Sequence, residues 1–272
     1  MHTPDITFKA AGHCIQAFRS RADILAAILD IILPRHCIVC GRKLLLNEKI
    51  ICIYCHADFP YTYNWNMSRN RMADKFNAFI QKHIDDITGL RNGQHEPYAL
   101  AVSLFMYRGN AGYRRIPQSL KYHGDMAAGK FFGSELGKRI AASPHFSDID
   151  TIIPVPLHWK REWDRGYNQS LIIAREIASW TGATLKPFLL RRKKKTGTQT
   201  RLSVEEKEAN VDNAFAVPER YASHVPASSH ILLVDDVFTT GATLFFCFKA
   251  LRGIYGPETR ISVATLAVVD NG

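Results

Sequence analysis

A chain of 272 residues can hold one large domain with a small additional module, or two modest domains. Hydrophobic residues make up 46% of it and charged residues 22%, a composition typical of an ordinary soluble globular protein and not of a low-complexity chain. Its 35 Lys and Arg residues against 25 Asp and Glu residues give a formal net charge of +10. Anionic partners are therefore expected, either phosphate-rich small molecules or nucleic acid.

The amino-terminal segment, residues 1–33, shows no evident secretory signal and no transmembrane segment. Its most apolar stretch, ILAAILDIIL at residues 24–33, is too short to cross a bilayer and contains Asp30. We expect an amphipathic helix there, ended by Pro34. These features predict a cytoplasmic protein, in which the six cysteines are not expected to form a disulfide framework.

Four of the six cysteines form two Cys-x-x-Cys pairs with eleven residues between the pairs. Zinc prefers four soft ligands in a tetrahedron, and each pair supplies two thiolates. Buried or redox-active thiols are the alternative, but two matched pairs in a reducing compartment favour zinc. We predict a zinc-binding module over residues 34–60, with a structural ion bound by Cys37, Cys40, Cys52 and Cys55.

Residues 61–97 are polar and irregular, and we interpret them as a connection that contains a candidate helix, MADKFNAFIQKHIDDI. Beside the cysteines, Tyr54, Tyr61, Tyr63 and Trp65 either stack nucleic-acid bases or pack as a small satellite core, and we favour the core. The main domain is expected over residues 98–272. Its first elements, in chain order, are a strand at 98–107, a short helix ending near 117–125, a helix at 127–142 and a strand at 151–155.

A basic loop follows the strand at 151–155, before a helix that begins near Asn168. Loops at the carboxyl ends of strands are where open α/β sheets bind ligands, and arginines there can hold a pyrophosphate through paired hydrogen bonds. An exposed basic loop without a ligand is the alternative. The candidate pyrophosphate-binding residues are Pro156, Leu157, Arg161 and Arg165.

After a predicted strand at 184–190, a long polar segment begins with the basic run Arg191 to Lys195. Loops of this length inside a compact domain are often functional, so this one is either a lid over a polyanion or a solvated face.

The stretch HILLVDDVFTTGATL, residues 230–244, predicts a buried strand over residues 231–234, followed by two adjacent aspartates and a hydroxyl-rich turn before a helix. Backbone N–H groups at a helix start favour an anion, and a glycine lets the backbone approach it closely. We interpret the turn as a monophosphate site made by Thr239, Thr240, Gly241, Ala242 and Thr243. Asp235 and Asp236 can accept hydrogen bonds from a sugar diol, so the stretch predicts a ribose 5-phosphate site.

This stretch resembles the signature with which type I phosphoribosyltransferases bind phosphoribosyl pyrophosphate (PRPP). Together with PVPLH at 154–158, RGYNQS at 165–170, LKYHGD at 120–125 and the cysteine pairs, it resembles the ComF family, which includes ComFC and GntX. The resemblance implies an α/β fold: a Rossmann-like, mainly parallel sheet flanked by helices, behind a small zinc module. It further implies ribose binding by Asp235 and Asp236, and a hood containing Gln199, Lys207 and Asn210. Lys207 stands where the family pattern has arginine, and lysine lacks the planar fork.

Two functions follow from this resemblance. The first is a phosphoribosyltransferase that uses PRPP with Mg²⁺, linked to competence, DNA uptake or use of external DNA. The second is a non-catalytic sensor of PRPP or nucleotides, or an accessory protein that binds single-stranded DNA and works with DNA-uptake or recombination proteins. The residues identify no general base, with His158 and Asp236 as the only candidates, and they do not name the acceptor.

Overall fold

The computed structural model describes residues 33–88, 96–109, 111–122, 124–192, 214–222, 225 and 227–270. The helix expected before Pro34 and the hood residues Gln199, Lys207 and Asn210 lie outside these ranges. Among the residues described, no helix combines the length and the apolar character needed to cross a membrane.

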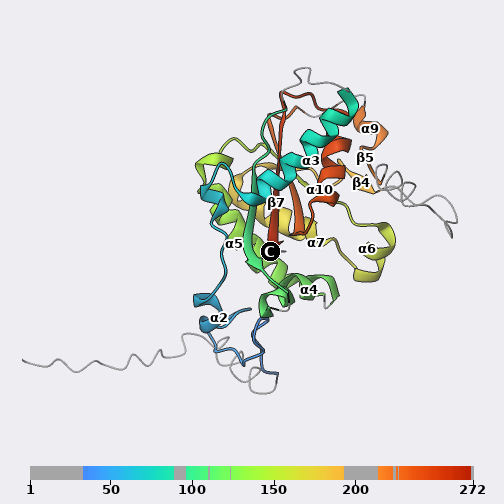
Figure 1. Ribbon diagram of the computed structural model, residues 1–272. Helices are drawn as coiled ribbons and strands as arrows, with labels where there is room; N and C mark the ends of the chain where they lie inside the picture. Colours follow the sequence, from blue (N-terminus) through green and yellow to red (C-terminus); the bar gives the residue numbers. More distant parts are fainter. Residues whose placement is uncertain are drawn as a thin grey trace, which may run out of the picture.

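A five-stranded parallel sheet forms the centre of the molecule, in the order β1-β7-β6-β2-β3 (Figure 1). Its strands are β1 (Ala101–Tyr107), β2 (Thr151–Pro154), β3 (Thr184–Leu185), β6 (His230–Phe238) and β7 (Arg260–Val269). The register places Ile231 of β6 beside Ile261 of β7 and beside Thr151 of β2. Helices cover both faces of such a sheet, which is why its central strands are continuous apolar runs.

Two pairs of helices enclose the sheet. On one face lie α5 (Met126–Ala141) and α7 (Gln169–Thr181), and on the other lie α3 (Arg71–Thr88) and α10 (Ala242–Arg252) (Figure 1). Side chains alternate along β6, so Leu232 packs with the first pair and Leu233 with the second. The expected class, a mainly parallel sheet flanked by helices with a four-cysteine module, is confirmed.

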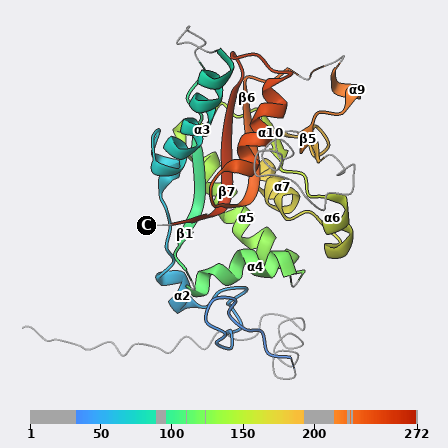
Figure 2. The same cartoon turned by 45° about the vertical axis from the view of Figure 1, so that its right-hand side comes forward.

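Shorter elements complete the described chain. They are α2 (Ile53–Ala57), η1 (Asn64–Asn66), η2 (Gly112–Arg114), α4 (Arg115–Tyr122), η3 (Pro144–Phe146), α6 (Trp159–Arg165), α9 (Glu219–Ala222) and the antiparallel pair β4 (Arg191–Arg192) and β5 (Phe215–Ala216). In both ribbon views the cysteine module with α2 lies directly against α4 (Figure 1, Figure 2).

Residues 61–97, interpreted from the sequence as a connection, contribute to the main core. Phe76 of α3 is fully buried and meets Phe248 of α10, with ring centroids 6.0 Å apart. Farther towards the amino terminus, Tyr61, Tyr63 and Trp65 contact one another through their rings, with Arg139 stacked over two of them. This arrangement agrees with the expected satellite core for three of its four residues, although Tyr63 remains 55% exposed. The fourth, Tyr54, is 65% exposed and lies under Arg42.

Three local expectations were wrong. The basic loop before Asn168 contains a helix, α6, because WKREWDR is rich in helix formers and Gly166 supplies the left-handed residue (φ 77°) that ends it. The strand expected at 184–190 is only the two-residue β3, which is followed by a turn. β6 does not end before the aspartates but continues through them to Phe238, since it pairs with β7 beyond that point.

Candidate functional site

The strand order reverses between β2 and β6. From β2 the chain moves outward to β3, whereas from β6 it moves in the opposite direction to β7. Ligands of open α/β sheets bind in the crevice beyond the carboxyl ends of the strands at such a reversal. The topology alone therefore directs attention to the segments that follow Pro154 and Val234.

A cavity of about 400 Å³ lies at this position. It brings together predicted site residues from two segments at least 70 positions apart in the sequence. Those that line it are Pro156, Leu157, Arg165, Asp235, Asp236, Thr239 and Thr243. The side chain of Arg161 is outside the described part of the chain, and only its backbone, in α6, is placed.

The two aspartates have different surroundings, because adjacent residues of a strand point to opposite faces. Oδ1 of Asp235 accepts hydrogen bonds from the Ser170 hydroxyl and from the backbone N–H of Asp236, both at 2.9 Å. Oδ2 of Asp236 lies 2.9 Å from the ammonium of Lys121 on α4. Burial, and secondarily the charge of Asp236, raise the pKa of Asp235 to about 7.

The hydroxyl-rich turn depends on Gly241. This residue is the N-cap of α10 and has a φ of 92°, a conformation that disfavours any side chain. A Cβ there would lie 2.7 Å from Cζ of the buried Phe238, so close packing also requires glycine. Thr240, whose hydroxyl accepts from the Ala242 N–H at 3.3 Å, is exposed beside Thr239 and Thr243. Thr240, Gly241 and Ala242 shape the turn, while Thr239 and Thr243 reach the cavity.

Several residues that the sequence interpretation did not select also line the cavity. They are Tyr107, Arg114, Pro117, Gln118, Lys121, Tyr122, Val155, Gln169, Ser170, Arg192 and Val237. The α4 residues among them come from a helix that precedes β2 in the chain but lies across the end of β6. LKYHGD at 120–125 supported the family resemblance, yet nothing in its spacing indicated a contact with Asp236.

Cations outnumber the carboxylates in the cavity wall. Lys121, Arg165 and Arg192 come from three separate elements, and Arg192 belongs to β4 at the base of the segment predicted as a hood. The guanidinium of Arg165 lies 5.7 Å from the ring centre of Tyr122, which brings α6 close to α4. A phosphate-rich ligand is the chemistry that such a wall attracts.

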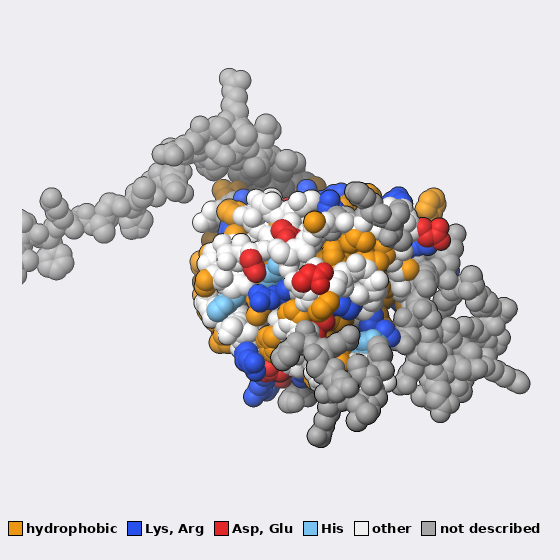
Figure 3. Space-filling model, turned by 90° about the horizontal axis from the view of Figure 1, so that it is seen from above, with side chains coloured by type: hydrophobic (Ala, Val, Ile, Leu, Met, Phe, Trp, Pro, Cys, Tyr) orange, Lys and Arg blue, Asp and Glu red, His pale blue; other side chains and the backbone are white. Residues whose placement is uncertain are grey.

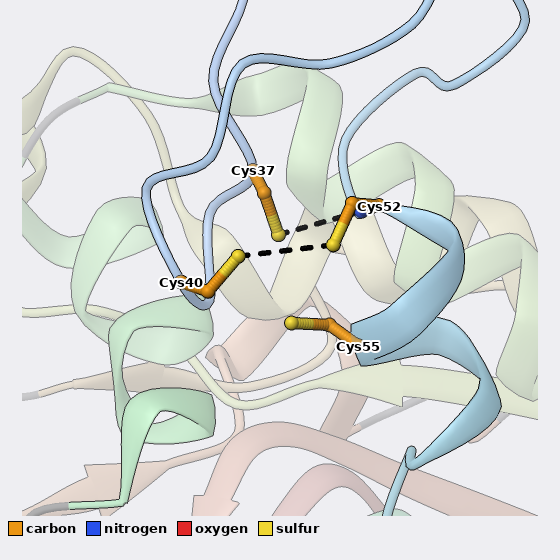
Figure 4. A group of neighbouring side chains, drawn as sticks. All are labelled: Cys37, Cys40, Cys52 and Cys55. Carbon is orange, nitrogen blue, oxygen red and sulfur yellow. Dashed lines mark hydrogen bonds between the residues drawn. The ribbon is translucent and has the colours of Figure 1, made fainter.

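The four predicted metal ligands converge at a second place in the molecule. Cys37 and Cys40 come from one loop, Cys52 and Cys55 from the start of α2, and all four side chains point toward a common centre (Figure 4). Their sulfur atoms lie within 4.8 Å of one another, and Cys40 Sγ is 3.7 Å from Cys52 Sγ. Zn–S bonds of about 2.3 Å in a tetrahedron require sulfur separations of about 3.8 Å. The four cysteines are therefore positioned to hold a metal ion.

Backbone groups favour the ionised form of Cys37, which a metal ligand requires. Burial opposes ionisation of Cys37, but N–H groups of Cys40, Cys52 and Val39 donate to its sulfur and lower its pKa to about 7. The carboxylate of Glu48 accepts from the N–H groups of Leu45 and Ile53, both at 2.7 Å, and so ties the loop between the pairs to α2.

The amino end of the sheet differs from the carboxyl end in the distribution of its charged side chains. Seen from the amino end, the described surface shows basic, acidic and apolar side chains interspersed, without a field of one sign (Figure 3). A second cavity of about 540 Å³ lies there, lined by both Arg260 and Asp148. The predicted ligand-binding residues that line a cavity therefore lie at the carboxyl end of the sheet.

No protein-family model matches the chain. It is similar to Competence protein F of Haemophilus influenzae, with 27% identity over 230 residues that cover 83% of this chain and 94% of that protein. It is 22% identical to Competence protein ComFC of Bacillus subtilis over 75% of this chain and 89% of that protein. DNA utilization protein YhgH of Escherichia coli K12 is 34% identical over 96 residues, which span 35% of this chain and 40% of YhgH.

Two of these similarities extend over most of both chains, and the cysteine cluster of the structure fits an amino-terminal metal module. Together they support what the sequence motifs indicated, a ComF-family protein.

Proposed function

We propose that the cavity binds PRPP and that the chain is a phosphoribosyltransferase-like protein serving DNA uptake or the use of external DNA. The observation that carries the proposal is the convergence, at one reversal of strand order, of a carboxylate pair, a helix-start turn and several cations. PRPP presents a diol, a monophosphate and a pyrophosphate, and each has a matching group in the cavity.

In this proposal Asp235 and Asp236 accept hydrogen bonds from the ribose hydroxyls. The N–H groups at the start of α10, with the hydroxyls of Thr239 and Thr243, bind the 5-phosphate. Ser170 holds the carboxylate of Asp235 in place through its 2.9 Å hydrogen bond. The raised pKa of Asp235 fits this role, because a diol supplies the donors that an ionised, buried carboxylate requires.

The pyrophosphate is assigned to the segment around Pro156 and Leu157, with Arg165 and the predicted Arg161 as cations. Mg²⁺ bound to the pyrophosphate oxygens would neutralise charge that develops as the leaving group departs. Gln199, Lys207 and Asn210 are proposed to close over it. We assign no general base: in the structure His158 caps α6, where its Nδ1 accepts from the Lys160 N–H.

The cysteine site is proposed to hold Zn²⁺ as a structural ion. Four thiolates complete a tetrahedron and leave no position for a substrate, and a reducing compartment such as the cytoplasm suits them. The role in DNA uptake or utilisation comes from the names of the similar proteins, two of which are competence proteins.

Calorimetric titration of PRPP with Mg²⁺ into the metal-loaded protein tests the proposal. We expect saturable binding to wild type and a loss of at least about a hundredfold in Asp235→Asn with Asp236→Asn, since two charge-assisted hydrogen bonds are removed. The metal content of the double variant should stay at the wild-type value, which separates loss of the site from loss of the fold. Equal PRPP affinity in the two proteins would refute the ribose assignment.

Single-stranded DNA binding is the second candidate, favoured by one observation. Tyr63 is 55% exposed in contact with the rings of Tyr61 and Trp65, and Arg139 lies within 5.2 Å of two of the three ring centres. Aromatic rings beside arginine are a surface on which bases stack. Affinity for an oligonucleotide that falls steeply with salt, and falls again in Tyr63→Ala, would support this candidate.

A further inference from the structure

The cysteine module and the ligand cavity share one short helix, α4. Its last turn carries Lys121 and Tyr122, which line the cavity, and Lys121 reaches Asp236 at 2.9 Å. Its first turn lies against the module. Since α4 has only eight residues, about 12 Å at the usual helical rise, a shift at one end is transmitted to the other.

Tyr113 of η2, directly before α4, and Arg115, the first residue of α4, donate to backbone carbonyls of the module. The hydroxyl of Tyr113 donates to the carbonyls of Cys55 at 3.0 Å and Asp58 at 2.9 Å. Nη1 of Arg115 donates to the carbonyl of Val39 at 3.1 Å. Val39 lies between the two cysteines of the first pair, Cys55 is a predicted ligand, and Asp58 ends α2, so these acceptors belong to the two predicted metal-binding turns and to the helix that continues the second.

Close packing reinforces these hydrogen bonds. At Gly112 a Cβ would lie 2.9 Å from the carbonyl oxygen of Val39, which shows how tightly the two segments meet. Ile116 and Leu120 of α4 are fully buried in the same core as Cys37 and Cys52. The buried face of α4 and the module thus belong to one continuous core.

The other end of α4 is held by the main domain. Gln169 Nε2 donates to the carbonyl of Leu120 at 3.2 Å, and the hydroxyl of Tyr167 donates to the same oxygen. The helix is therefore fixed at one end by α7 and its preceding loop, and at the other by the metal-binding turns.

We infer that the cysteine module acts as a positioning element for the ligand cavity: through Tyr113 and Arg115 it fixes α4, so metal in the cysteine site determines how firmly the cavity binds its ligand. This inference rests on the proposed function for the identity of the ligand, PRPP. Its mechanical part, the dependence of α4 on the module, is independent of PRPP.

Hydrogen exchange of the full, ligand-free chain tests the mechanical part. Removal of the metal with a chelator should speed exchange at the α4 amides from Gln118 to Tyr122 about tenfold or more, while the α7 amides change less than about twofold. Unchanged exchange in α4 after the metal has been removed would overturn the inference. Because no PRPP is present, this result stands whether or not PRPP is the ligand.

Calorimetry with PRPP and Mg²⁺ on metal-loaded variants tests the functional part. Tyr113→Phe removes the hydroxyl that bonds the module and should weaken PRPP binding about tenfold with metal content unchanged. The matched control is Tyr98→Phe, which removes one hydroxyl bond, to Asp74 at 2.7 Å, at the opposite end of the sheet and should leave affinity within about twofold. If Tyr113→Phe loses metal, Arg115→Met tests the second anchor in its place.

The outcomes separate the two claims. Wild-type affinity in metal-loaded Tyr113→Phe and Arg115→Met would overturn the positioning role, even if PRPP binds. Failure of metal-loaded wild type to bind PRPP would refute the proposed function, and the exchange experiment would then decide the inference alone. Altered PRPP affinity in Tyr113→Phe together with faster exchange in α4 on metal removal would establish both.

Discussion

The aspartates at the two ends of the parallel sheet have pKa values shifted in opposite directions. At the amino end, Asp150 precedes β2 and accepts hydrogen bonds from the hydroxyls of Ser228 and Ser229 and from the Ser229 N–H, at 2.5 to 2.7 Å. Burial opposes its ionisation, but these donors outweigh burial and lower its pKa to about 2. This carboxylate ties β2 to the start of β6.

At the carboxyl end, Asp235 and Asp236 are consecutive and confined by the cavity wall. The pKa of Asp235 is raised, first by burial and then by the neighbouring charge of Asp236. The chain also adopts a left-handed conformation at Gly241 to form the turn beside them. One end of the sheet has satisfied carboxylates that stabilise the fold, and the other keeps an arrangement that is unfavourable until a ligand completes it.

Substitution of Gly241 should produce the largest loss of stability at the carboxyl end. Gly241→Ala places a methyl group 2.7 Å from buried Phe238 at a φ of 92°, so we expect the free energy of unfolding to fall by about 2–4 kcal/mol. Urea denaturation measures it. Gly124→Ala is the control, since its φ is 65° but a methyl group there has nothing within 4 Å, and it should cost only about 1–2 kcal/mol. Equal losses in the two variants would show that the Phe238 contact is unimportant.

At the amino end, Asp150→Asn should lower the free energy of unfolding by about 1–2 kcal/mol at pH 7, allowing for partial solvent screening of this side chain. The folded pKa lies below the unfolded one, so the stabilisation is present above about pH 4 and disappears as the pH falls towards about 2. The difference between variant and wild type should shrink over that range. PRPP affinity should not change, and a large loss of affinity would contradict the separation of the two ends.

The cysteine site and the strand–turn–helix of the carboxyl end could be predicted because their information is local. Two Cys-x-x-Cys pairs define four ligands, and the run from Ile231 to Thr243 carries strand, acids and turn within one short segment. In both cases the chain connectivity itself brings the groups together, whatever the remainder of the fold does.

The rest of the cavity depends on tertiary structure. Lys121 meets Asp236, 115 positions later, only because α4 is oriented by the module at one end and by Gln169 at the other. The hydrogen bond of Ser170 to Asp235 requires β2 and β6 to be neighbours. No periodicity or residue spacing in the sequence predicts either contact. The failure to predict α6 was different, since its helix formers were present but the prolines before it suggested a loop.

Substitution of a second aspartate should change the free energy of unfolding in the opposite direction to the substitution of Asp150. Asp235→Asn should raise the free energy of unfolding by about 1 kcal/mol at pH 8, because the wild-type carboxyl must ionise in a buried position. A folded pKa above the unfolded one means that wild type loses stability as the pH rises from about 4 to about 7, so the gain should vanish near pH 4. Thermal unfolding across this range measures it. Destabilisation at pH 8 would mean that Asp235 is satisfied in the ligand-free protein.

The smallest expected effect on stability concerns Lys121, the cation that pairs with Asp236 at the carboxyl end of the sheet. Lys121→Ala removes the ammonium 2.9 Å from Asp236 but also opens that carboxylate to the water of the cavity, so stability should fall by only about 0.5 kcal/mol. Because the charge of Lys121 lowers the folded pKa of Asp235, its loss should extend the pH-dependent fall in stability to higher pH, while the fall still begins near pH 4. Lys138→Ala, which breaks an exposed pair with Glu135, is the control and should leave that profile in place. An unmoved profile in both variants would mean that Asp235 does not sense the cation of α4, and the contrast between the ends of the sheet would then rest on burial and on the charge of Asp236.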